Sequence, residues 1–185
     1  MSKLIPIVAL LCSLLGFSNF TVASPTVEVE TTLGSFVIEL NSQAAPITVA
    51  NFLRYVEDGS YKGSIFHRVI PDFMAQGGGF NSEMGRLPTY PPIKNEASNG
   101  LLNNQATIAM ARTNNPDSAS RQFFINYSDN SNLDYRRGSD GYAVFGTVTS
   151  GFSVIQEMAT KPTARYKQMA NVPKTPIVII DIKIK

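Results

Sequence analysis

Short apolar segments bounded by turn-forming residues dominate this sequence and restrict its fold more than any other feature. Stretches rich in Gly, Pro, Asn and Ser separate them. Segments of about four to eight residues with this composition are typical of β-strands and are too short for stable helices. The predicted strands of this kind are 65–70, 73–76, 107–111, 122–126, 142–148 and 177–184.

A hairpin and two helices complete the predicted secondary structure. Strict alternation of apolar and polar residues predicts the hairpin, whereas apolar residues at i, i+3, i+4 and i+7 predict the helices. In total the pattern indicates about eight strands and two helices. The segments are a hairpin of 27–31 and 36–40 with a turn at Leu33-Gly34, a helix over 46–58, and a helix between Gly151 and Pro162.

This order of elements contains no alternation of strand and helix, so it favours a mainly β fold with antiparallel strands. We expect a closed eight-stranded antiparallel β-barrel capped by two α-helices, because closure leaves no exposed strand edge and each helix can cover an open end. A β-sandwich fits the same pattern and is the alternative. Residues 81–100 and 162–176 are expected to be surface loops.

Residues 1–23 have the features of a cleavable secretory signal peptide. Lys3 precedes a largely apolar run at 4–17, and small residues return before Ala23, where cleavage is expected. Cleavage after Ser24 is an alternative. The apolar run is shorter than the about 20 residues that a membrane span requires.

Removal of this segment leaves a single domain, residues 24–185, without cysteine, because Cys12 is the chain's one cysteine. Leu11 stands before Cys12 where lipid attachment requires a small residue, so no membrane anchor is expected. Loss of Lys3 reduces the 16 basic side chains to 15, against 14 acidic ones. This balance, without runs of like charge, indicates no nucleic-acid partner.

One predicted strand-turn-strand segment holds the most informative polar residues. It contains the only histidine, His67, next to Arg68, among apolar side chains. An arginine in such a place needs hydrogen-bonding partners, and Gln76 is the nearest candidate. Together with Phe73 and Met74, these residues indicate an apolar groove with one fixed cation, a groove that could bind a peptide.

Several other chemistries lack the residues that they require. The sequence has no Gly-x-Ser-x-Gly motif, and no thiol remains after removal of the signal peptide. One histidine without an acidic cluster is too little for a metal site, so neither metal nor cofactor is expected. Gly77-Gly78-Gly79 lacks the Lys-Ser/Thr of a phosphate-binding loop, which favours close packing or a turn.

Over essentially all of 24–185, the sequence resembles the cyclophilins, a family of peptidyl-prolyl cis-trans isomerases. Several separated motifs match in the same order, which is more specific than any single motif. The signal peptide and Met110-Ala111-Arg112-Thr113 resemble the bacterial periplasmic branch. The matching segments are PITVANF (46–52), FHRVIPDFMAQGG (66–78), IAMA (108–111), QFFI (122–125) and YAVFG (142–146).

The resemblance implies Arg68 as the catalytic residue and a set of substrate-binding residues around it. The implied substrate-binding residues are Phe73, Met74, Phe124 and Leu133 around the proline ring, His67 shaping that cup, Gln76 positioning Arg68, the backbone of Ala111 and Arg112 with Gln122 along the peptide, and Tyr142 in place of a histidine that many members have.

One position departs from the family. Asn132 precedes Leu133 where many cyclophilins have a tryptophan, and the chain contains no Trp. In those members the indole packs on cyclosporin and donates a hydrogen bond to it. The resemblance therefore predicts weak cyclosporin binding for this chain.

Three hypotheses for the function remain at this point. The first is a monomeric isomerase that acts on proline-containing polypeptides during the folding of exported proteins, in the periplasm, or secreted if the source lacks an outer membrane. The second is a proline-peptide-binding chaperone module with little turnover. In the third, Arg68 is only a structural residue of a secreted β-barrel.

Overall fold

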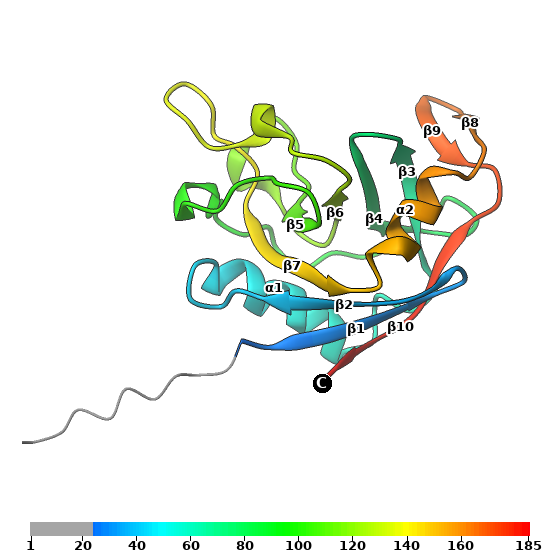
Figure 1. Ribbon diagram of the computed structural model, residues 1–185, viewed down its shortest axis with the longest axis horizontal. Helices are drawn as coiled ribbons and strands as arrows, with labels where there is room; N and C mark the ends of the chain where they lie inside the picture. Colours follow the sequence, from blue (N-terminus) through cyan, green and yellow to red (C-terminus); the bar gives the residue numbers. More distant parts are fainter. Residues whose placement is uncertain (1–23) are drawn as a thin grey trace, which may run out of the picture.

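Eight antiparallel strands close into one barrel in the computed structural model of the chain, as the sequence predicts, and the alternative sandwich is wrong (Figure 1). The structure describes residues 24–185, so the predicted signal peptide lies outside the described residues. Around the barrel the strands follow the order β1-β10-β3-β4-β6-β5-β7-β2. They are β1 (Thr26–Thr31), β2 (Gly34–Leu40), β3 (Ser64–Ile70), β4 (Met74–Asn81), β5 (Thr107–Met110), β6 (Phe123–Asn126), β7 (Val144–Ser150) and β10 (Ile177–Ile184).

The first and last strands of the barrel pair with each other. Val27 lies opposite Ile184, and the Lys185 N–H donates to the Thr26 carbonyl at 2.8 Å. Because β1 also pairs with β2, it has a neighbour on both sides. The pairing leaves none of the eight barrel strands with an open edge.

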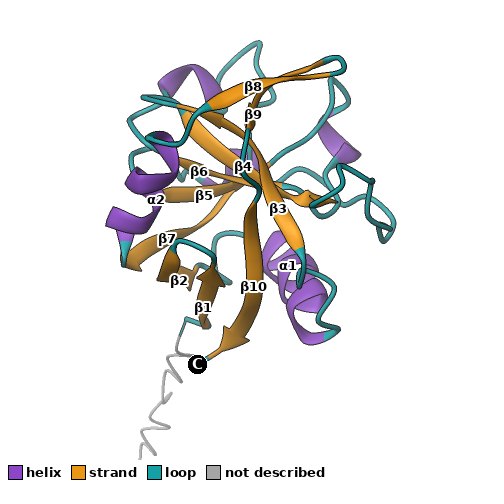
Figure 2. Ribbon diagram, turned by 90° about the vertical axis from the view of Figure 1, so that its right-hand side faces the viewer, coloured by secondary structure: helices purple, strands orange, loops and turns teal. Residues whose placement is uncertain are grey.

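Two helices cover the barrel at different places, as Figure 2 shows for α1 (Pro46–Glu57) and α2 (Phe152–Ala159). Glu96 binds the N-terminal turn of α1, where its carboxylate accepts from the Ile47 N–H at 3.1 Å and the Thr48 N–H at 2.7 Å. A carboxylate at this position satisfies amide groups that the helix itself cannot bond. Neither helix, nor any other within residues 24–185, is long and apolar enough to cross a membrane.

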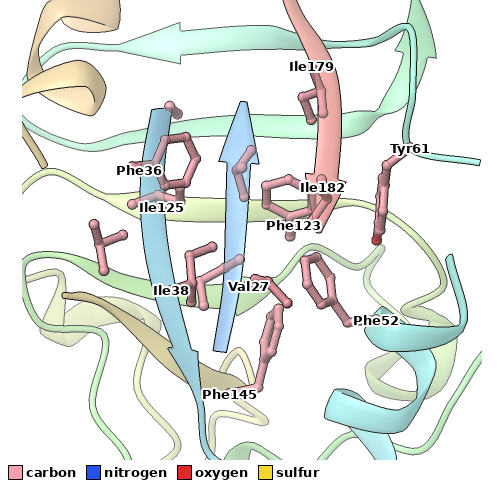
Figure 3. Packing of buried hydrophobic residues seen from close by; sticks show 14 of the residues in the cluster. Val27, Phe36, Ile38, Phe52, Tyr61, Phe123, Ile125, Phe145, Ile179 and Ile182 are labelled. Carbon is pink, nitrogen blue, oxygen red and sulfur yellow. The ribbon is translucent and has the colours of Figure 1, made fainter. Parts of the chain in front are cut away.

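The hydrophobic core fills the barrel interior and extends to both helices. Phe52 of α1 lies at the centre of an aromatic group in which its ring centroid is 5.3 Å from that of Tyr61, 5.7 Å from that of Phe123 and 5.3 Å from that of Phe145 (Figure 3). Ile155 of α2 is fully buried in the same cluster. Burial of these side chains explains the helical periodicity seen in the sequence.

The expectation of a surface loop over 162–176 is wrong, because a small hairpin occupies most of it. Its strands, β8 (Thr163–Tyr166) and β9 (Met169–Pro173), pair only with each other. Of their nine residues only two, Val172 and Pro173, are buried, so no apolar periodicity marks these strands. The other expected loop, 81–100, begins with the last residue of β4 and is otherwise irregular, as expected, apart from the short 3-10 helix η1 (Ala97–Asn99) and isolated bridges.

Candidate functional site

A second apolar cluster lies on the outer face of the barrel over β4, β5, β6 and β7. Strand alternation produces it: Phe123 packs inside the barrel, whereas Phe124 packs in the outer cluster. In the same way Ala75 faces inward and Met74 outward. The apolar runs in the sequence therefore serve two surfaces, the core and this outer cluster.

A cavity of about 170 Å³ opens over this cluster, and we call it the cup. All of its lining residues are among the site residues that the family resemblance implies. His67 and Gln122, which the resemblance also implies, line a neighbouring cavity instead. The residues of the cup are Arg68, Phe73, Met74, Gln76, Ala111, Arg112, Phe124, Leu133 and Tyr142.

Arg68 is one of two arginines that line the cup, and neutral groups hold it in place. It lies opposite Gln76 in the pairing of β3 with β4, and its Nη1 donates to Gln76 Oε1 at 3.4 Å. Gln76 Nε2 in turn donates to Gln122 Oε1 at 2.9 Å, which orients the amide oxygen of Gln76 toward the guanidinium. The ion pairs found within residues 24–185 do not involve Arg68. Its charge therefore remains available to a ligand.

His67 is buried beside the cup, not within it. Phe66 pairs with Gly77 and Arg68 pairs with Gln76, so His67 is the extra residue of a β-bulge. Its ring centroid lies 4.6 Å from that of Phe80. Burial, together with the nearby positive charges of Arg68 and Arg86, lowers its pKa to about 4. His67 is therefore uncharged at neutral pH.

Tyr142 and Leu133 form another part of the wall of the cup. Leu133 ends the 3-10 helix η3 (Ser131–Leu133), and the Tyr142 N–H donates to its carbonyl at 2.9 Å. The ring centroid of Tyr142 lies 5.7 Å from that of Phe124 in an edge-to-face arrangement. Asn132, the residue at the position of the family's tryptophan, is exposed on η3.

Asn130 holds two walls of the cup together, and the sequence analysis missed it. Its side-chain Nδ2 donates to the Phe73 carbonyl at 2.8 Å, while its own carbonyl accepts from the Leu133 N–H at 2.8 Å. Nδ2 also donates to Asn126 Oδ1 at 2.8 Å, so two buried amide side chains support the site. Asparagine is common in turns, and no pattern in the sequence distinguishes this one.

The backbone at the end of β5 is partly occupied. The Ala111 N–H donates to the Gln122 carbonyl at 2.9 Å, so this N–H is not free to bind a peptide. The Ala111 carbonyl and the adjoining Arg112 backbone are the groups that could continue the β-type pairing with a bound chain. The arrangement as a whole is a cup with an apolar floor, two arginines that are absent from the ion pairs found within residues 24–185, Arg68 and Arg112, and a strand end beside it.

Comparisons with known proteins agree with this geometry. The family described as "Cyclophilin type peptidyl-prolyl cis-trans isomerase/CLD" matches residues 26–184. A peptidyl-prolyl cis-trans isomerase of Acinetobacter baylyi is 51% identical over 178 residues, which cover 96% of this chain and 95% of that protein. Peptidyl-prolyl cis-trans isomerase A of Dickeya dadantii is 47% identical over 184 residues, covering 98% and 97%.

Solved structures are similar as well. The crystal structure of a cyclophilin type peptidyl-prolyl cis-trans isomerase from Cryptosporidium parvum has a TM-score of 0.73 and 27% identity, covering 88% of this chain and 98% of the other. The same protein in the presence of the dipeptide Ala-Pro has a TM-score of 0.72 and 26% identity, covering 86% and 98%.

Proposed function

Since this chain belongs to the cyclophilin type peptidyl-prolyl cis-trans isomerase family, we propose that Arg68 catalyses the isomerisation within the cup and that the substrates are exported polypeptides. The observation that supports the role of Arg68 is its place in the cup. It is a guanidinium with neutral hydrogen-bonding partners at the edge of an apolar cavity.

The chemistry of the reaction explains why such a group accelerates it. Rotation about an X-Pro bond breaks amide resonance, with a barrier of about 18–20 kcal/mol. In the twisted state the proline nitrogen becomes pyramidal, and its lone pair becomes a better hydrogen-bond acceptor. A hydrogen bond from Arg68 to this nitrogen is therefore stronger in the twisted state than in either planar state. Such differential binding lowers the barrier without a covalent intermediate.

The apolar residues of the cup contribute in two ways. Phe73, Met74, Phe124 and Leu133 bind the proline ring and hold it still while the preceding carbonyl rotates. They also exclude water around Arg68, which strengthens its electrostatic interaction with the substrate. Gln76 keeps the guanidinium oriented through the hydrogen bond to Nη1.

The export role is supported by the sequence of residues 1–23, which has the pattern of a signal peptide. We place the mature protein in the periplasm, or outside the cell if the source lacks an outer membrane. Its substrates there are newly exported chains, in which uncatalysed proline isomerisation takes about 10–100 s. N-terminal sequencing of the mature protein tests this role: Ser24 or Pro25 should be the first residue, and an intact Met1 in the cytosol contradicts it.

The experiment that tests the mechanism measures the cis-to-trans exchange of a short X-Pro peptide by NMR with the wild type, Arg68→Ala and Arg68→Lys. Circular dichroism checks that all three are folded. We expect Arg68→Ala to reduce kcat/KM by about 10²-fold or more, as is typical when one donor to a transition state is removed. Arg68→Lys keeps the charge but loses the planar group, so we expect it to recover only part of the activity.

Three outcomes contradict this mechanism. If the folded wild type binds the peptide without accelerating exchange, the chain is a peptide-binding chaperone module. If folded Arg68→Ala retains full activity, Arg68 is not the catalytic group. If Arg68→Ala unfolds, the activity of the folded Arg68→Lys variant tests the mechanism instead. Full activity of Arg68→Lys contradicts a role for the planar guanidinium group.

A further inference from the structure

A second cavity lies beside the cup and shares Arg68 and Gln76 with it. It has a volume of about 390 Å³, against about 170 Å³ for the cup. Its far side is formed by the β8–β9 hairpin, which contributes Gln168 and Asn171. Because the two cavities share these residues, they are close enough for one bound polypeptide to reach both. We call it the Arg86 pocket, after the arginine at its rim.

The Arg86 pocket is positively charged. Of its ten lining residues, two are arginines, Arg68 and Arg86, and none is Asp or Glu. The ion pairs found within residues 24–185 include neither arginine. Four side-chain amides complete the polar lining and can donate hydrogen bonds to an anion. These are Gln76, Gln122, Gln168 and Asn171.

Arg86 is held in position but remains exposed. It forms a β-bridge with Phe80, and its guanidinium carbon lies 5.3 Å from the centroid of the Phe80 ring. The turn that leads to it is tied by Asn81, whose Oδ1 accepts from the Gly85 N–H at 2.7 Å and whose N–H donates to the Gly85 carbonyl at 3.0 Å. An arginine on a fixed turn loses less conformational entropy when it binds a carboxylate.

We propose that the Arg86 pocket binds the carboxylate of an Asp or Glu near the substrate proline, so that this enzyme prefers prolyl bonds with an acidic residue nearby. The proposal rests on the proposed function, because it places the substrate proline in the cup. Arg68 lines both cavities, so its replacement would also remove the catalytic group. Arg86 lines only the second cavity, and its replacement therefore tests the anion site alone. Planar guanidinium groups suit carboxylates, which they can bind through two parallel hydrogen bonds.

The experiment compares pairs of X-Pro peptides that differ only by Glu or Gln, placed about two to four residues from the proline on either side, which is within reach of an extended chain. For at least one position we expect kcat/KM to be about two- to five-fold higher for the Glu peptide, the effect of a partly exposed ion pair. In about 0.5 M salt the preference should shrink, because the pair is screened.

Two variants test whether Arg86 is responsible. Arg86→Gln should reduce the Glu-to-Gln ratio to about one. Arg165→Gln removes the same charge from an exposed position of β8 outside the pocket, and it should leave the ratio as in the wild type. Equal rates for every Glu and Gln pair in the wild type overturn the proposal. So does a preference that survives in Arg86→Gln.

Failure of the proposed function gives a different result. If no peptide is isomerised, the isomerase mechanism fails, and the same Glu and Gln pairs are then compared by their Kd in NMR titrations. A tighter Kd for Glu that disappears in Arg86→Gln supports the anion site even then. Equal Kd values in that case overturn it.

Discussion

The guanidinium carbon of Arg112 lies 4.5 Å from the centroid of the Tyr142 ring, so a cation covers one face of a ring that lines the cup. Two backbone carbonyls fix this arrangement. Arg112 Nε donates to the Gly141 carbonyl at 2.9 Å, and Nη1 donates to the Thr113 carbonyl at 2.9 Å. The stacked pair therefore fixes one part of the wall of the cup.

Replacing Arg112 with methionine should weaken substrate binding more than catalysis. Arg112→Met keeps an apolar stem but loses the stacked cation and its hydrogen bonds, which allows Tyr142 to move. Since an exposed cation–π pair contributes about 0.5–1 kcal/mol, we expect KM to rise about two- to five-fold with little change in kcat. Steady-state kinetics check this, with Arg137→Met, at an exposed position, as the control. A lower kcat at unchanged KM contradicts this role.

Cyclosporin should inhibit this enzyme weakly. Asn132 is exposed on η3 beside Leu133, and it offers neither the apolar area nor the ring N–H of a tryptophan. We expect Asn132→Trp to tighten cyclosporin binding by about tenfold or more, because a well-placed Trp contact contributes at least about 1.4 kcal/mol. Calorimetric titration of both proteins measures the change. Inhibition of the wild type at low nanomolar cyclosporin would falsify this prediction.

The stability of the protein should decrease as the pH falls, in part because of His67. Its pKa is about 4 in the folded protein against an ordinary value of 6.5, so the unfolded chain binds a proton first. The contribution of neutral His67 to the free energy of unfolding is complete above pH 6.5 and is lost as the pH falls toward 4. The difference between the two pKa values corresponds to about 3 kcal/mol of stability. Urea unfolding between these pH values should show a smaller decrease for His67→Gln. The wild type and His67→Gln have the same carboxylates, so these contribute equally to both. If the free energy of unfolding falls equally with pH in the two proteins, burial of His67 is not responsible for the decrease.

Arg121 should be among the most important residues for stability. It is 1% exposed, and its three guanidinium nitrogens donate to the carbonyls of Gly78, Pro88 and Ser60, each at 2.6 Å. Burial lowers its pKa, yet the group is held by carbonyl oxygens and aromatic faces instead of by a carboxylate.

Its replacement leaves the carbonyls of Gly78, Pro88 and Ser60 without this donor, and the Gly78 carbonyl belongs to a buried residue. We therefore expect Arg121→Met to lower the free energy of unfolding by about 3–5 kcal/mol. Urea denaturation measures this. Arg165→Met, at an exposed position of β8, should change it by no more than about 0.5 kcal/mol. If Arg121→Met lowers the free energy of unfolding by no more than the Arg165→Met control does, the carbonyls find other partners and the prediction is wrong.

Much of the barrel could be predicted because burial on one face leaves a period in the sequence. In β1, Val27, Val29 and Thr31 are buried and alternate with partly exposed residues. The hairpin β8–β9 has no such pattern, because it buries little, and so it was missed. The predicted strand over 73–76 ended too early, because glycines interrupt the apolar pattern while β4 continues through them.

The glycines of β4 are there for close packing, one of the two explanations that the sequence allowed. A Cβ on Gly79 would lie 2.5 Å from the Gln122 side chain, and one on Gly78 would lie 2.9 Å from the Tyr61 ring. Such contacts come from residues distant in sequence, so no local pattern contains them. The same limitation applies to Arg121, whose carbonyl partners belong to three separate turns and strands.

Four residues of the cup could be predicted from their own segment of sequence, whereas the other five were identified only through the family resemblance. The four are Arg68, Phe73, Met74 and Gln76. Alternation explains why Phe124 faces outward, but periodicity alone does not separate an outer cluster from the core. The β-bulge at His67 is likewise invisible in the sequence, as is the fact that His67 lines the neighbouring cavity instead of the cup. Asn130 acts through its backbone and side chain together, which requires the folded geometry.

The pairing of β1 with β10 also determines when folding can finish. A chain still leaving a ribosome or a membrane pore lacks Ile177–Ile184, so β1 has no partner on that side and the barrel stays open. Contacts between the two ends have the greatest possible sequence separation, and such contacts form slowly. The order of strands thus keeps the barrel of this chain open until residues 177–184 are available to pair with β1, so the first strand formed is among the last to be completed by its neighbours.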